Sequence, residues 1–98
     1  MELYAIRRRN GWASAEALQQ AAAVSARVGD EEMPQDIRWI RSYVVREPDS
    51  SLGTVCIYEA SSPEKIREHA QRVGMPATEV FPVVDTVLVR PDPVKTAK

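Results

Sequence analysis

The chain has 98 residues, of which 44% are hydrophobic, and 13 basic against 14 acidic residues leave a formal net charge of −1. This length predicts a single domain with one thin core, to which dimerisation would naturally add. Because no excess of positive charge is available to neutralise phosphates, we expect no nucleic-acid partner. We also expect no membrane partner, since no apolar run could span a bilayer and the N-terminus lacks the order of a signal peptide. A single cysteine can form no internal disulfide, which favours a reducing cytoplasm.

The first part of the chain predicts a strand followed by a helix. Residues 2–8 alternate in hydrophobicity and include Tyr and Ile, so they predict a strand that a turn at Asn10 ends. Ser14 is a suitable N-cap for an alanine-rich helix over 15–28, and Gly29 is a suitable C-cap. The small residues along one side of this helix predict a close approach to a sheet.

The middle of the chain predicts a hairpin and a second helix. Residues 37–45 and 54–60 read as strong strands, and the polar turn between them predicts antiparallel pairing. A helix then begins with Ser62 as its N-cap and Pro63 at its first position, where the missing N–H does no harm. Gly74 ends this helix.

The C-terminal part predicts one more strand and a tail. Residues 78–89 favour a strand, in which Pro82 indicates an edge position or a bulge. The tail over 90–98 contains two prolines and no core residue beyond Val94, which predicts a segment that is mobile or draped on a neighbouring chain. We therefore expect one domain over 1–89.

The predicted order of elements is βαββαβ. Two right-handed βαβ-type units within this order give a four-stranded antiparallel sheet with both helices on one face, which is the ferredoxin-like arrangement of the α+β class. The other face needs a cover if it is apolar. In a small protein the usual cover is a second copy, which would make a homodimer of the dimeric α+β-barrel type.

Alternation along the strands assigns side chains to the two sheet faces. Trp39, Arg41 and Tyr43 share one face of the second strand, and Cys56 and Tyr58 share one face of the third. We expect the aliphatic set under the helices, which leaves these five residues on the open face. Trp and Tyr beside Arg are typical of dimer contacts and of ligand pockets, and a dimer contact is the preferred interpretation.

The single cysteine and the single histidine are the natural candidates for metal binding. Cys56, among apolar residues, is interpreted as a small buried hydrophobe. His69 is interpreted as a partly buried ring bonded to backbone or to a carboxylate such as Glu59 or Asp85. With the face assignment above, the sheet separates the two. If the parity is the reverse, Cys56, Tyr58 and His69 share a cleft suited to nickel, copper or zinc.

No other motif in the chain indicates a site. There is no HxxxH, CxxC or HExxH spacing for a metal, and no GxGxxG or Walker sequence for a nucleotide. The run RRRN, from Arg7 to Asn10, is interpreted as solvated charge.

Three stretches resemble a known family: IRWIRSYV, CIYEASSPEKIREHAQRVGMPATEV and the alanine-rich helix before them. Together they resemble a family of small actinobacterial proteins, once a domain of unknown function, that is named after a streptomycete nickel-binding member. The resemblance covers about 15–84 and implies a ferredoxin-like fold, a dimer and nickel binding. Of the metal ligands, only His69 carries over, through the Glu-His-Ala motif. A full site would need carboxylates, water or a second subunit.

These observations favour a small dimeric protein that binds a metal ion or a small ligand, with nickel implied by the resemblance. The alternative is a dimeric α+β-barrel enzyme for a small aromatic or oxygenated substrate, with His69 or Tyr43 as acid/base and Arg41 holding an anion. A structural interaction module is the third hypothesis. The absence of a dense titratable cluster weighs against the enzyme.

Overall fold

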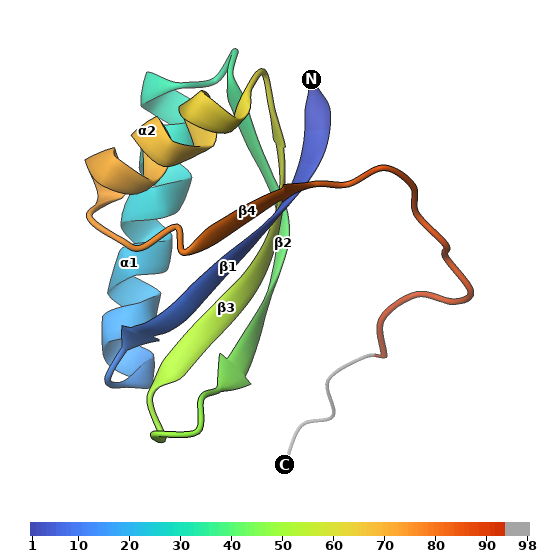
Figure 1. Ribbon diagram of the computed structural model, residues 1–98. Helices are drawn as coiled ribbons and strands as arrows, with labels where there is room; N and C mark the ends of the chain where they lie inside the picture. The colour runs from blue at the N-terminus through green and yellow to red at the C-terminus, as the bar shows by residue number, and fades with distance from the viewer. Residues whose placement is uncertain (94–98) are drawn as a thin grey trace.

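A computed structural model describes residues 1–93, so 94–98 of the predicted tail lie outside the described residues. Figure 1 shows two layers, an antiparallel sheet and two helices packed on one of its faces. The strand order is β2-β3-β1-β4, which confirms the predicted ferredoxin-like arrangement. The elements are β1 (Glu2–Trp12), α1 (Ala15–Arg27), the π-helical turn η1 (Val28–Glu32), β2 (Ile37–Arg46), β3 (Leu52–Ala60), α2 (Pro63–Val73) and β4 (Glu79–Pro82). Within residues 1–93, neither helix has the length and hydropathy that a bilayer crossing requires.

The helix starts and one helix end follow the predicted caps. Ser14 Oγ accepts a hydrogen bond from Ala17 N at 3.1 Å, which satisfies a free donor in the first turn of α1. Ser62 caps α2 in the same way. Gly74 ends α2 with a left-handed φ of 84°, a conformation that favours glycine.

The predicted C-cap at Gly29 is wrong. The helical backbone continues through Gly29 as the turn η1, because Met33 N donates to Val28 O at 3.0 Å and so closes a wider, π-type turn. Gly29 is buried there, with Ile37 and His69 as its neighbours. The backbone of α1 and η1 therefore lies close to α2.

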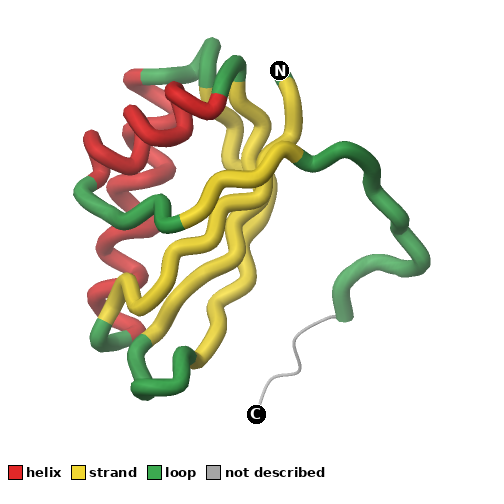
Figure 2. The backbone as a smooth tube through the Cα atoms, in the orientation of Figure 1, coloured by secondary structure: helices red, strands yellow, loops and turns green. Residues whose placement is uncertain are grey.

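The ends of β1 and β4 differ most from the prediction, and β3 begins at Leu52 and not at Thr54. β1 does not end at Asn10 but continues to Trp12, because Asn10 takes a φ of 51° and the pairing with β3 shifts between Arg8 and Trp12. β4 ends at Pro82, where the chain has no N–H to continue a ladder. One further bond, from Val83 N to Leu3 O at 2.9 Å, follows it. Residues 83–93 then leave on the side of the sheet opposite the helices (Figures 1 and 2).

The predicted common face for five residues is also wrong, and a β-bulge in β2 is one cause. Trp39 pairs with Tyr58 and Arg41 pairs with Ile57, so Ile40 is an extra residue between them. A bulge of this kind reverses the alternation of side chains along the strand. Trp39 therefore lies on the helix side, whereas Arg41 lies on the open side.

The other cause is the size of the residues on α1. Its small side chains leave room for large ones from the sheet, so Tyr58 and Cys56 lie under the helices, only 2% and 4% exposed. Arg41 and Tyr43 do lie on the open face, as predicted. The core that results combines residues from both layers: Tyr4, Ile6, Val28, Met33, Ile37, Cys56, Tyr58, Ala60 and Ile66.

Candidate functional site

A chain of polar contacts on the helix side joins β3, α1 and α2. The hydroxyl oxygens of Tyr58 and Ser25 are 3.0 Å apart. His69 Nε2 lies 3.1 Å from the backbone oxygen of Ser25. A carbonyl oxygen only accepts, so Nε2 carries the proton and donates. His69 Nδ1 is buried and has no hydrogen-bond partner among the described residues. Its lone pair is therefore free.

Burial sets the protonation of this imidazole. His69 is 1% exposed. Desolvation lowers its pKa, the bond to the Ser25 carbonyl opposes that effect, and the charges of Arg8 and Arg72 add to the lowering. The ring is therefore neutral at neutral pH. Neutral imidazole is the form that can ligate a metal ion.

Arg8 is a buried cation on the same side of the sheet, although its place in the run RRRN predicted solvated charge. It is 1% exposed, and its Nη1 donates to the Pro76 carbonyl at 2.7 Å. Its Cζ lies 5.7 Å from the ring centroid of Tyr58, within the range of a cation–π contact. Arg8 Nη2 has no partner within residues 1–93, and none of the ion pairs of that region includes Arg8.

Two small cavities lie between the helices and the sheet. The α1 cavity has a volume of about 90 Å³, and its lining includes Arg8, Trp12, Leu18, Ala22, Trp39, Cys56, Tyr58 and Met75. The His69 cavity has a volume of about 120 Å³ and is lined by Ser25, Ala26, Gly29, Asp30, Ile37, Trp39, Tyr58 and His69. Ser25, Trp39 and Tyr58 line both cavities, and the rings of Trp39 and Tyr58 stack with centroids 5.9 Å apart.

Cys56 and His69 thus lie on the same side of the sheet, and the predicted separation of the two by the sheet is wrong. They nevertheless line different cavities, with Tyr58 lining both. The Cys56 thiol donates to Thr54 Oγ1 at 3.2 Å. Of the partners predicted for His69, neither carboxylate, Glu59 nor Asp85, forms a hydrogen bond with it. The ring bonds to backbone, at Ser25 O.

The open face carries a second, exposed polar cluster. Asp92, in the segment that leaves β4, accepts from Arg41 Nη1 at 3.1 Å and from the Tyr43 hydroxyl at 2.8 Å. The Tyr43 hydroxyl and Asp92 together raise the pKa of Arg41. A hollow of about 550 Å³ lies between this face and residues 83–92. The sheet separates this cluster from His69, so of the two acid/base candidates in the predicted enzyme site only Tyr43 lies beside Arg41.

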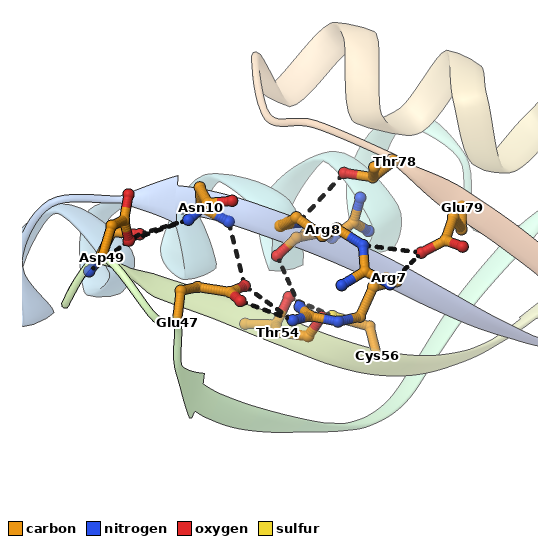
Figure 3. Close-up of polar contacts among 11 residues, drawn as sticks. Arg7, Arg8, Asn10, Glu47, Asp49, Thr54, Cys56, Thr78 and Glu79 are labelled. Atoms are coloured by element: carbon orange, nitrogen blue, oxygen red, sulfur yellow. Dashed lines mark hydrogen bonds and ion pairs between the residues drawn. The ribbon is translucent and has the colours of Figure 1, made fainter.

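The basic run is solvated only in part, because Arg9 and Asn10 are exposed whereas Arg7 is half-buried and Arg8 is buried. Arg7 Nη2 donates to both carboxylate oxygens of Glu47 at 2.9 Å, and Asn10 N donates to the same carboxylate at 3.1 Å (Figure 3). These donors, with Asn10 N the largest influence, lower the pKa of Glu47. Arg9 pairs with a carboxylate of β4. This cluster surrounds Gly53 near the start of β3.

Comparison with known proteins connects this architecture to one family. A family model described as nickel responsive protein SCO4226-like matches residues 4–83. The chain belongs to the SCO4226-like family. The crystal structure of SCO4226 from Streptomyces coelicolor A3(2) is similar, with a TM-score of 0.66 and 19% identity over 87% of this chain and 99% of that one. At this identity the match shows a shared fold. No curated protein matches the chain.

Membership of the SCO4226-like family confirms the resemblance found in the sequence. It also directs attention to nickel, because the family is named for its response to that metal. Among residues 1–93, however, the structure brings together no group of three or more His, Cys, Asp or Glu side chains that could hold a metal ion.

Proposed function

We propose that this chain is a homodimeric binding protein whose ligand is a divalent transition metal, nickel in the first instance, with His69 as one ligand. The observation that carries the proposal is the state of the His69 ring. Its Nε2 donates to Ser25 O and its Nδ1 lone pair is unpartnered within the described residues. Histidines that ligate metals almost always donate their other ring N–H in this way, which fixes the tautomer.

The metal-binding side chains around His69 supply one contact to a metal ion and not a complete site. Nickel accepts imidazole nitrogen readily. The described residues of one chain offer no cluster of three metal-binding side chains around it. The residues present therefore do not fit a complete nickel centre within one chain. The further ligands would have to be water or groups of a second subunit.

The open face supports the homodimer. Residues 83–93 expose apolar side chains, with Val84 95% exposed and Val87, Leu88 and Val89 also exposed. Val87, Leu88 and Val89 line a hollow to which Leu3 and Ile57 contribute from the sheet. A second copy would cover both the segment and the sheet face. A net charge of −1 gives the chain no overall excess of positive charge that would favour nucleic acid or an anionic membrane.

Calorimetric titration of nickel into the full chain tests the metal proposal. His69→Gln is the informative variant, because the Gln amide can still donate to Ser25 O while the Nδ1 lone pair is lost. Cys56→Ser is its control, since the thiol lines the other cavity. We expect binding by the wild type and by Cys56→Ser, and none by His69→Gln. No heat with the wild type, or unchanged binding by His69→Gln, would contradict the proposal.

A further inference from the structure

Arg8 is a buried charge for which the described part of the chain supplies no counterion. A guanidinium stays protonated in proteins, and burying a charge without a partner is costly. Its Nη1 is satisfied by the Pro76 carbonyl at 2.7 Å, whereas its Nη2 has no partner within residues 1–93. Its other contact, through Cζ, is with the face of the Tyr58 ring, which is also neutral. The Nη2 donor and the positive charge of Arg8 are therefore available to an anion.

The cavity that Arg8 lines is otherwise mostly apolar. Leu18 and Ala22 line it from α1, Cys56 from the sheet, and Met75 from the chain after α2. A protein cavity of about 150 Å³ can hold benzene, so a volume of about 90 Å³ suits a body of roughly three or four carbon atoms. The shape and lining therefore select a short hydrocarbon with one charged end.

We propose that the α1 cavity binds a small organic monocarboxylate, whose carboxylate pairs with Arg8 and whose short aliphatic body lies against Leu18, Ala22 and Met75. A carboxylate matches the guanidinium in charge and geometry. The apolar lining disfavours inorganic phosphate, which has no apolar body to bury. This site is independent of the metal contact proposed for His69, because His69 does not line the α1 cavity.

The mouth of the cavity also provides the signal for a binding measurement. Trp39 and Val44 line it and are 37% and 53% exposed, so they mark its open side. The second tryptophan of the chain, Trp12, lines the same cavity. Both fluorophores are therefore next to any occupant.

Tryptophan fluorescence and thermal unfolding with butyrate test the proposal on the full chain. Butyrate is titrated to about 100 mM against sodium chloride of equal ionic strength. Butanol supplies the same body without the charge, and phosphate supplies a charge without the body. We expect saturable binding of butyrate, with a dissociation constant on the order of 1 mM. We expect a rise in Tm with butyrate and neither effect with butanol or phosphate.

Three variants identify the site. Arg8→Met removes the charge at similar size and should weaken butyrate binding by about tenfold or more. Arg9→Met is its control, because Arg9 is exposed and paired with Glu79, and it should bind butyrate as the wild type does. Ala22→Leu fills the cavity while keeping Arg8, and it should abolish the response even if Arg8→Met does not fold.

Two results would overturn the proposal. One is the absence of a saturable response of the wild type to butyrate. The other is a response that persists unchanged in Ala22→Leu. A phosphate response equal to that of butyrate would also reject the carboxylate, since it would show that Arg8 attracts any anion without regard to the apolar lining.

Discussion

The hydroxyl of Tyr58 on β3 lies 3.0 Å from the hydroxyl of Ser25 on α1, in the buried layer between helices and sheet. Ser25 at the same time accepts from His69 on α2 through its backbone oxygen. One small residue thus joins three elements that are far apart in sequence. The two proposed sites lie on either side of this link, because Tyr58 lines both cavities.

Tyr58→Phe should lower the free energy of unfolding by about 1 kcal/mol, because it removes a buried hydrogen bond and keeps the ring stacked on Trp39. Ser25→Ala should cost a similar amount. Since both remove the same bond, the double variant should cost clearly less than the sum of the two. Urea unfolding of the three variants checks this. Strict additivity would show that the two hydroxyls do not interact in solution.

The stability of the metal-free chain should fall as the pH drops below about 6.5. Burial lowers the pKa of His69 from its ordinary 6.5, so the unfolded chain binds a proton there before the folded chain does. The stability that the unprotonated His69 ring contributes is fully present above pH 6.5 and is lost as the pH falls toward the lowered pKa of the folded state. Because His69 is the single histidine of the chain, no other histidine titrates in this window.

Denaturant unfolding between pH 7.5 and pH 5, with a chelator present, measures this slope. His69→Gln should flatten it, since the amide does not titrate. A wild-type curve that stays level from pH 7.5 to pH 5 would mean that His69 is not protected from protonation by the fold.

Gly53→Ala should destabilise the chain more than Gly74→Ala. A Cβ at Gly53 would lie 2.7 Å from the Arg8 carbonyl oxygen and would overlap a carboxylate oxygen of Glu47, so backbone and the Arg7–Glu47 pair would both have to move. Gly74 has open space around it but a φ of 84°, which costs an L-residue about 1 kcal/mol. Thermal unfolding of the two variants compares them. A smaller loss of Tm for Gly53→Ala would contradict the tight packing around Gly53.

Tyr43→Lys should dissociate the proposed homodimer, whereas Val44→Lys should not. The two residues are adjacent on β2 and both are exposed, but their side chains point to opposite faces of the sheet. The two substitutions therefore add the same charge at neighbouring positions and differ in the sheet face that receives it. An interfacial aromatic is a typical hot spot, worth about 2 kcal/mol or more. Sedimentation at micromolar concentration should show two chains for the wild type and Val44→Lys. A monomeric wild type would reject the homodimer.

Local chemistry in the sequence predicted the elements and several of their ends. Ser14, Ser62 and Gly74 act through their nearest neighbours along the chain, so the helix boundaries they set could be read directly. The order of elements then determined the ferredoxin-like topology, because few connections are compatible with it. The homodimer, the cytoplasmic location and the division into a domain over 1–89 and a tail stay predictions.

The faces of the strands depended on tertiary structure. Ile40 is an extra residue only in the pairing of β2 with β3. The sequence of β2 alone therefore could not reveal that Trp39 and Arg41 point to opposite faces of the sheet. The small residues of α1 were visible in the sequence. That they would admit Tyr58 and Cys56 instead of aliphatic side chains depended on how closely the two layers pack.

The sites were decided by contacts between residues far apart in the chain. The alternation of β1 already grouped Arg8 with Tyr4 and Ile6, which was a usable signal that it would be buried. Its bond to Pro76 and its lack of a counterion among the described residues appear only when the layers are assembled. His69 was recognisable from its chemistry, yet its partner lies 44 residues away. Local sequence therefore determined which elements form, and long-range packing decided which polar groups they bury unpaired.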